Sequence, residues 1–354
     1  MSFDELDNYL KNCIDTKLIP GCTCWVGTKK ETLFFEAYGN AQIVPKSVPI
    51  EKNCIFDIAS LTKPIATAVA VALLQERGVM KLSDRIDGFL TALKDTPLGD
   101  KTIMQLLTHT SGLPAWYPTY LFPVATRLKD IAKLGKNINN VVYSCLGYIL
   151  LGKIVEQVVH TSLDYFFVEN ITSKIASRTL RFGPVTAGIL VAATESGNEH
   201  ERKMANQYGD VSNIHWRTDL IRGEVHDGNA YYAFDGIAGN AGLFSNTEDL
   251  VAFARAYLNG DIVSENSLEL MTTDHTGGDE KRGLGWKMDL YPGLLSPQSF
   301  GHTGFTGTML VVDPELDLII ILLANAVHPV VKPGLMTPIR RETIRIISET
   351  IRTK

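Results

Sequence analysis

The sequence predicts an α+β fold of the sandwich type, in which both ends of the chain contribute strands to one antiparallel sheet flanked by helices. Two observations support this fold class. Runs of β-prone residues occur at 22–27 and 32–38, and again between 285 and 323. The residues between them, from about 80 to 235, show helical patterns and few convincing strands. This order indicates one sheet built from both termini, with a mostly helical insert.

The same pattern predicts two domains. Residues 1–80 and 236–354 are expected to form a sheet-and-helix domain, and residues 81–235 a mostly helical domain, with the active site between them. A chain of 354 residues, with 45% hydrophobic and 21% charged residues, has enough apolar side chains for a large core. We find no internal repeat and no low-complexity segment.

The first quarter of the chain contains a helix, a hairpin and a second helix. Apolar residues at helical spacing predict an amphipathic helix over 4–18, ending before Pro20. The two β-prone runs that follow are separated by Thr28–Glu31, which suits a hairpin. A stripe at i, i+4 spacing then predicts a buried helix from about Ser60 to Gln75.

The rest of the chain is helical first and strand-rich later. Residues 102–107 and 141–159 have the apolar spacing of helices, whereas 192–230 are polar and glycine-rich and are expected to be mostly loop. Residues 339–351 predict a closing helix. Four strands are predicted before it: 285–290, 300–303, 308–312 and 318–323.

Composition argues against several classes of partner and cofactor. The net charge is −5, and Lys and Arg are scattered, so we expect neither nucleic-acid binding nor an anionic membrane surface as a partner. No stretch approaches the roughly 20 apolar residues of a membrane span. Five cysteines, an odd number without C-x-x-C spacing, indicate neither a disulfide framework nor a zinc site, and no cofactor is predicted.

The first residues are acidic and lack a basic segment followed by an apolar one, so they do not resemble a signal peptide. Together with reduced cysteines, this predicts a cytoplasmic protein. A leader removed from the chain would make it secreted instead.

Ser60 and Lys63 are the first candidates for chemistry. Proline is tolerated only in the first turn of a helix, so Pro64 indicates that the helix begins close to Ser60. Lys63 then lies one turn on, on the same face as Ser60. A serine becomes a nucleophile when a base takes its proton, and a neutral lysine can be that base. Ser60 alone is equally compatible with a simple helix cap.

Two later segments carry further candidates. Tyr143 precedes the helix predicted over 141–159 and could relay a proton to or from a lysine, although an ordinary half-buried aromatic residue is the simpler interpretation. The segment Gly301–Gly307 lies at the edge of a predicted strand. Its glycines permit close backbone approach, so an edge N–H could face a developing oxyanion; a tight strand-edge turn is the alternative.

Taken together, these segments resemble a known superfamily. Ser60-Leu61-Thr62-Lys63, Tyr143-Ser144-Cys145 and His302-Thr303-Gly304 are similar, in order and spacing, to the Ser-x-x-Lys, Tyr-x-Asn and Lys/His-Thr-Gly motifs of serine β-lactamases and penicillin-binding proteins, in the class C-like and esterase-like branch. The resemblance runs from about residue 15 to 350. It implies a β-lactamase/DD-peptidase-like fold.

The resemblance also implies roles for individual residues. Ser60 would be the acylated nucleophile, Lys63 its base or proton partner, and Tyr143 a second proton carrier. His302 would orient Tyr143 or contact a substrate carboxylate. The amides of Ser60 and Phe305 would form the oxyanion hole. The expected substrate-binding residues are Cys145, Thr303, Gly304 and Phe305.

Two positions depart from the family pattern. Cys145 stands where the family usually has asparagine, so an amide that would contact a substrate amide carbonyl is absent. His302 stands where many relatives have lysine, and an unperturbed histidine carries at most a partial charge at neutral pH. Both changes are expected to weaken recognition of β-lactams or carboxylate-bearing peptides without removing the nucleophile.

Other polar and sulfur-containing residues favour structural roles. His226-Asp227 has no further ligands at metal spacing and is interpreted as part of a loop beside the site. His109 is expected to be a hydrogen-bonded structural histidine. Cys22 and Cys24 lie on one face of a strand and suit core packing.

The leading hypothesis is a serine-dependent acyl hydrolase that forms an acyl-enzyme on Ser60 and acts on a β-lactam, a D-alanyl peptide or an ester. Its partner would be a small-molecule or peptidoglycan-like substrate. The alternative, motivated by Cys145, is a penicillin-recognising or peptide-binding protein that acylates or binds without efficient turnover.

Overall fold

The computed structural model describes residues 2–138, 140–175, 177–186 and 188–353, and within these ranges its largest sheet has seven antiparallel strands. The strand order is β3-β2-β1-β10-β9-β8-β7. The first three strands come from the start of the chain and the last four from its end, which confirms the sheet expected from the sequence. The strands are β1 (Gly21–Gly27), β2 (Thr32–Gln42), β3 (Val48–Pro49), β7 (Lys287–Met288), β8 (Phe300–Thr303), β9 (Met309–Asp313) and β10 (Leu318–Ala324).

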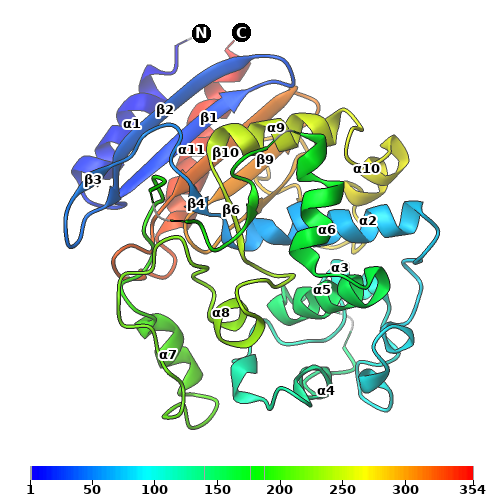
Figure 1. Ribbon diagram of the computed structural model, residues 1–354. Helices are drawn as coiled ribbons and strands as arrows, with labels where there is room; N and C mark the ends of the chain where they lie inside the picture. The colour runs from blue at the N-terminus through cyan, green and yellow to red at the C-terminus, as the bar shows by residue number, and fades with distance from the viewer. Residues whose placement is uncertain (1, 139, 176, 187, 354) are drawn as a thin grey trace.

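Helices cover both faces of this sheet (Figure 1). α1 (Asp4–Asp15) and α11 (Met336–Arg352) pack on one face, and the two ends of the chain lie close together there. Successive side chains of β10 point to opposite faces of the sheet and so enter two different hydrophobic cores. Ile320 and Leu322 pack in the core with α1 and α11, whereas Ile321 packs in the larger core on the opposite face. Cys22 and Cys24 belong to the first core, as predicted.

The opposite face is covered by α2 (Val69–Glu76) and α9 (Thr247–Leu258), and the remaining helices extend away from the sheet (Figure 1). Those helices come mainly from the middle of the chain. They are α3 (Ile103–Leu107), α4 (Arg127–Lys133), α5 (Cys145–Val159), α6 (Leu163–Asn170), α7 (Glu199–Ala205), α8 (Gly228–Phe234) and α10 (Glu265–Met271).

A second, three-stranded sheet was not expected from the sequence. β5 (Arg181–Phe182) pairs with β6 (Leu243–Ser245), which also pairs with β4 (Phe56–Asp57). β5 therefore places a short strand inside the segment predicted to be mostly helical. Strands of two or three residues are too short to show the alternation by which strands are detected in a sequence.

Several predicted boundaries differ from those in the structure. The helix expected from residue 141 begins at Cys145, because the Ser144 side chain caps it by accepting a hydrogen bond from the amide of Gly147 at 3.4 Å. The strand expected at 285–290 is reduced to β7. The expected loop at 192–230 contains α7 and the start of α8, so the loop prediction is wrong for those residues.

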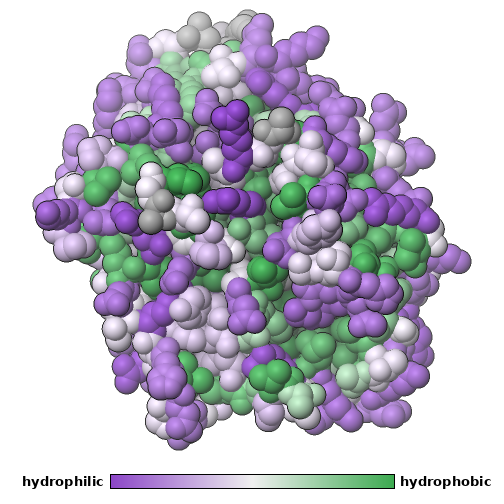
Figure 2. Space-filling view, in the orientation of Figure 1, coloured by the Kyte–Doolittle hydropathy of each residue, from purple (hydrophilic) through white to green (hydrophobic). Residues whose placement is uncertain are grey.

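Polar side chains cover most of the face shown in Figure 2, with hydrophobic residues in small groups between them. Within the described ranges, none of the helices has both the length and the apolar character that a bilayer crossing requires.

Candidate active site

Ser60 lies where β4 leads into the helix that ends with α2. Ala59–Leu61 form a 3-10 turn, and Lys63–Ala68 form a π-helical stretch that continues into α2. The predicted helix is therefore present, but its first turns are not α-helical. Within this segment the Lys63 Nζ donates a hydrogen bond to the Ser60 Oγ at 2.9 Å.

The turn that carries Ser60 is held from several sides. Ala59 has φ 47°, a left-handed backbone conformation that costs a non-glycine residue energy. Its N–H donates to the Asp57 carboxylate at 2.8 Å, and its carbonyl accepts from the Thr62 hydroxyl at 2.7 Å. The amide of Leu243 in turn donates to Thr62 at 3.1 Å. These hydrogen bonds hold the strained turn against the three-stranded sheet formed by β4, β6 and β5.

Lys63 is fully buried beside Ser60. Its ammonium also donates to the carbonyl of Asn240 at 3.0 Å and lies 5.1 Å from the centre of the Tyr143 ring. Burial lowers the pKa of Lys63, but the acidic groups around it, led by Cys145 and Tyr143, favour the charged form and the pKa lies above its ordinary value. Lys63 therefore keeps its proton at neutral pH.

Tyr143 is positioned by a histidine from the preceding loop. The amide of Ser144 donates to the Nδ1 of His109 at 2.9 Å, and the amide of Val142 donates to the His109 carbonyl at 2.8 Å. The His109 and Tyr143 rings lie 4.6 Å apart. This confirms the predicted structural role of His109. Burial raises the pKa of the Tyr143 phenol, while the charge of Lys63 limits that rise.

Cys145 is the first residue of α5, and its side chain lines the same cavity as Ser60. Its thiol is free. Burial raises the pKa of this thiol, although the Lys63 charge acts in the opposite direction. Cys145 is therefore an uncharged thiol at neutral pH.

His302, near the end of β8, is a neutral residue in this site. Its Nδ1 donates to the carbonyl of Thr303 at 2.8 Å, which leaves Nε2 as an acceptor without a hydrogen-bond partner in the described part of the chain. Burial lowers the pKa of His302 well below its usual range, and the charges of Lys63 and Arg282 lower it further. His302 is only 4% exposed and cannot provide a cation near pH 7.

The residues after β8 approach the Ser60 turn closely. A Cβ on Gly304 would lie 2.6 Å from the carbonyl oxygen of Ile58, so only glycine fits without displacement. The Thr308 hydroxyl donates to the same carbonyl at 3.1 Å. From α11, Arg340 donates to the carbonyls of Gly304 at 2.6 Å and Thr308 at 3.0 Å. The end of the chain thus holds this turn against the Ser60 segment.

The two amides expected to form an oxyanion hole are available. Neither the Ser60 nor the Phe305 N–H donates a backbone hydrogen bond to any residue that the structure describes. Both residues line the cavity. The Phe305 ring is half-exposed and stacks on His200 and His226 at 5.7 and 5.8 Å.

One cavity of about 570 Å³ brings the predicted residues together. Lys63 is the exception, since it lies beneath Ser60 and does not line the cavity. The lining includes seven of the eight expected site residues: Ser60, Tyr143, Cys145, His302, Thr303, Gly304 and Phe305.

Several residues of the site were missed in the sequence. Arg282, Arg340 and Glu201 line the cavity, and Asn240 supplies the carbonyl that accepts from Lys63. Single Arg and Glu residues in polar or helical segments carry no pattern that marks them. The glycine-rich stretch around Asn240 was the one available signal, because glycines permit the close backbone approach seen there.

His226 and Asp227 also line the cavity, but their hydrogen bonds are structural. The His226 ring pairs with Glu195 at 3.0 Å and its amide donates to Asp57 at 2.7 Å. Asp227 caps α8 by accepting from the amide of Ala230 at 2.8 Å. The predicted loop role is confirmed. The described residues include no group of three or more side chains suited to hold a metal ion.

Comparison with known proteins identifies the family. The pattern that defines the Beta-lactamase family matches residues 6–343, which is nearly the whole chain. The chain belongs to the β-lactamase family. It is 30% identical, over 93% of its length and 84% of the other protein's, to a protein of Escherichia coli K12 named "Putative D-alanyl-D-alanine carboxypeptidase".

Two further relatives of this β-lactamase-family chain are informative. A Bacillus subtilis protein named N-acetylmuramyl-L-alanine amidase is 29% identical over 85% of this chain and 74% of its own length. The structure of an octameric penicillin-binding protein homologue from Pyrococcus abyssi superposes with a TM-score of 0.75, at 22% identity, over 100% of this chain and 78% of that one. The latter shows that the two proteins share a fold.

Replacing Gly304 by alanine is expected to lower the free energy of unfolding by about 1–3 kcal/mol, because the new Cβ would overlap the Ile58 carbonyl and the Thr308 side chain. Urea denaturation measures this change. Gly88→Ala is the matched control, since a Cβ there meets nothing within 4 Å, and it should change stability by less than about 0.5 kcal/mol. Equal effects of the two substitutions would show that the close approach is not required.

Proposed function

We propose that this protein is a serine-dependent acyl hydrolase in which Ser60 is acylated and water then releases the acyl group. The observation that carries the proposal is the 2.9 Å hydrogen bond from the fully buried Lys63 to the Ser60 hydroxyl. A lysine is costly to bury, so one placed against a serine that faces a cavity suggests a catalytic purpose. Family membership supports the same reaction class.

The proton inventory favours a shared role for Lys63 and Tyr143. In the proposed reaction, the Ser60 oxygen attacks the substrate carbonyl carbon and its proton passes to this pair. The pair can accept this proton only in the form that has already lost one proton to solvent, in which the Lys63 ammonium stabilises a Tyr143 phenolate that acts as base; burial raises the pKa of the phenol, so this form is a minor one at neutral pH. The pair then returns the proton to the leaving group, and the free amides of Ser60 and Phe305 stabilise the oxyanion.

The cavity suits a substrate with a carboxylate, although His302 does not provide its charge. Lys287 and Lys332 line the cavity and form no ion pair with the residues that the structure describes. Arg282 and Arg340 also line it, but Arg282 pairs with Glu280 and Arg340 donates to the carbonyls of Gly304 and Thr308. The names of the Escherichia coli and Bacillus subtilis relatives point to peptidoglycan as a substrate source. We therefore propose peptidoglycan-like peptides, β-lactams and esters as the substrate classes to test, and the cytoplasm as the location.

The serine reaction is tested by covalent labelling. Intact-mass measurement after incubation with an activated phosphonate ester, and separately with a penicillin, should show one added probe on Ser60 of the wild type and none on Ser60→Ala. Ser47→Ala, at an exposed serine, should label like the wild type. The enzyme proposal is wrong if neither probe adds mass and Ser60→Ala hydrolyses esters like the wild type.

Labelling without turnover would favour the alternative, a protein that recognises penicillin or peptide but does not hydrolyse it. The specific observation behind this alternative is Cys145, which provides no amide to the substrate. A chromogenic ester separates the two functions, because a burst followed by many turnovers excludes the binding protein.

Cys145→Asn is expected to raise activity on β-lactams and D-alanyl peptides relative to simple esters by about fivefold, since a regained hydrogen bond is worth about 1 kcal/mol. The measured quantity is the ratio of kcat/KM between the substrate classes. Cys145→Ala removes the thiol without adding an amide and should leave the ratio close to the wild-type value. Identical ratios in both variants would contradict the proposed effect of Cys145.

His302 is expected to contribute no charge to substrate recognition across the pH range in which an ordinary histidine titrates. Its pKa lies well below the ordinary value because the ring is buried, so it stays neutral there. Two substrates with the same acyl group are compared: in one the leaving group is 3-hydroxybenzoate, which carries a carboxylate, and in the other it is methyl 3-hydroxybenzoate, which does not. The ratio of their kcat/KM values should stay constant with pH. Taking the ratio cancels titration of the shared base. A several-fold fall as pH rises would mean that His302 titrates near its ordinary pKa and binds the carboxylate.

A further inference from the structure

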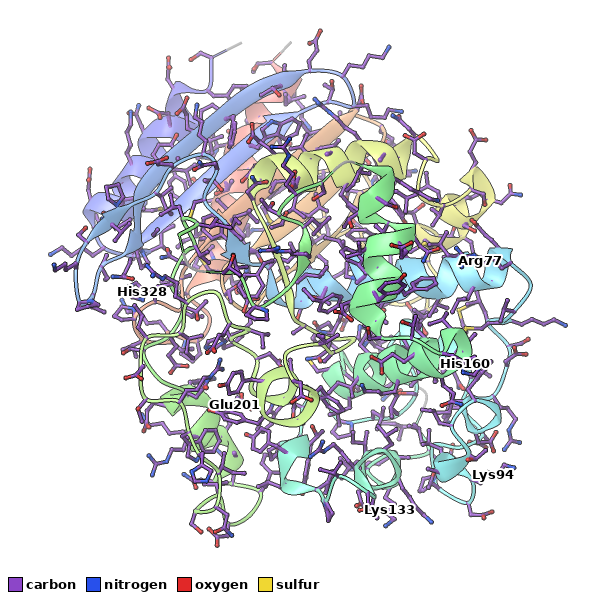
Figure 3. All side chains as sticks on the ribbon, in the orientation of Figure 1. Arg77, Lys94, Lys133, His160, Glu201 and His328 are labelled. Atoms are coloured by element: carbon purple, nitrogen blue, oxygen red, sulfur yellow. The ribbon has the colours of Figure 1, made fainter. Side chains whose placement is uncertain are left out.

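Glu201 is an acidic residue in the cavity wall that the proposed reaction does not use. It lies on α7, beside α8 (Figure 3), and is 8% exposed. One carboxylate oxygen, Oε1, accepts from the Tyr120 hydroxyl at 3.0 Å. For the other oxygen, Oε2, no hydrogen-bond donor is found among the residues that the structure describes, and no ion pair forms to Glu201 within those ranges. A buried carboxylate of this kind is costly unless something else satisfies it.

The neighbouring cation does not neutralise Glu201. Arg217 directs its guanidinium to Asn198 at 2.7 Å and to the carbonyls of Val225 and His226 at 2.8 and 3.2 Å. Its ion-pair partner is Glu224, at 3.8 Å. The guanidinium of Arg217 is thus hydrogen-bonded to Asn198 and to residues 225–226, and it forms no ion pair with Glu201.

The surroundings of Glu201 are built to accommodate a carboxyl group. A Cβ on Gly228 would overlap that carboxyl, so the glycine where α8 begins leaves room for the carboxyl in its present position. Burial, and after it the charge of Asp227, raise the pKa of Glu201 to about 8, so without a ligand the carboxyl group keeps its proton at pH 7. A cation bound beside it would favour the ionised form. A ligand cation placed beside these two acids would relieve both the burial cost and their mutual repulsion. Trp116 also lines the cavity and offers an aromatic face to a cation.

Glu201 is connected to the reacting centre by consecutive contacts. Lys63 donates to the carbonyl of Asn240 at 3.0 Å, and the Asn240 side-chain amide donates to Asp227 at 3.2 Å. Gly228, next in the chain, lies against the Glu201 carboxyl. Ser60, Asp227 and Glu201 all line the same cavity, so a substrate that reaches from Ser60 to Glu201 would lie within it.

The exposure of the cavity walls decides which part of the substrate reaches Glu201. The wall formed by residues 332–334 is exposed to solvent, whereas Glu201 is buried. The leaving group must depart into solvent after the first step, so it suits the exposed wall. The acyl group stays on Ser60 until hydrolysis, so it suits the buried one.

We propose that the cavity takes substrates whose acyl part carries a primary ammonium group, and that Glu201 binds this group. The inference rests on the proposed acyl-enzyme reaction and specifies its substrate class. A free amine on an amino acid or peptide has this chemistry. A charge-assisted bond from the ammonium to the unpartnered oxygen of Glu201 would supply the recognition.

The test compares paired esters. The p-nitrophenyl esters of ω-amino acids of increasing chain length are each matched with an alkanoate ester in which a methyl group replaces the ammonium. The wild type should hydrolyse the best ammonium ester with a kcat/KM at least about tenfold above its methyl partner. Glu201→Gln should remove this preference and leave hydrolysis of the methyl esters within about twofold.

Glu199→Gln is the matched control, because it removes the same charge from an exposed position of α7, where Glu199 pairs with Lys203 at 3.5 Å. It should keep the ammonium preference. The proposal is overturned if the wild type shows no preference at any chain length, or if Glu201→Gln retains it.

Two measurements keep the outcomes distinct. If Glu201→Gln does not fold, the wild type is tested with two inhibitors of methyl-ester hydrolysis, an alkylammonium ion and the matching alcohol. Stronger inhibition by the ammonium ion supports the proposal, and equal inhibition overturns it. Phosphonate labelling of Ser60 distinguishes failure of the inference about Glu201 from failure of the acyl-enzyme proposal. Labelling and methyl-ester turnover without an ammonium preference defeat only the inference about Glu201, whereas loss of both labelling and turnover defeats the acyl-enzyme reaction itself.

Discussion

The hydrogen bond from the buried Lys63 ammonium to Ser60 is the interaction on which the rest of the site depends. Removing an ammonium from water costs several kcal/mol, so its surroundings must compensate. The compensation comes from segments far apart in the sequence, namely the Ser60 hydroxyl, the Asn240 carbonyl and the rings of Tyr143 and Tyr148. Packing these segments around Lys63 therefore assembles the cavity at the same time.

The sheet built from both termini has a direct consequence for this cavity. α11, the last helix, places Arg340 against the carbonyls of Gly304 and Thr308. Burial lowers the pKa of Arg340 to about 10, which is still well above neutrality, so the guanidinium keeps its charge there. The C-terminal helix thus holds the turn that carries the Phe305 amide, while the preceding strand β8 is held by its pairing with β9. The fold fixes the position of one proposed oxyanion donor relative to the other.

The sequence predicted best what depends on local spacing. Ser60 and Lys63 are three residues apart, so their contact follows from one helical turn, and β10 follows from its apolar run. Glu201 could not be predicted, because its burial depends on Tyr120 and Gly228, which lie far from it in the chain. The polar composition around it indicated a loop. The two-residue strands β4 and β5 were also beyond reach, since pairing with β6 defines them and periodicity does not.

In the proposed reaction, proton transfer and substrate recognition use different ionisable groups of the cavity. Near Ser60, Cys145 and His302 are both uncharged at neutral pH, so Lys63 is the cation that can respond to charge developing on the serine oxygen. A fixed cation in place of His302 would disfavour the ammonium form of Lys63. The groups proposed to orient a substrate instead lie on the walls: Lys287 and Lys332 for a carboxylate, and Glu201, which a bound cation would ionise, for an ammonium group. If the proposed roles hold, substitutions on the walls would change substrate preference without changing the groups that transfer the proton at Ser60.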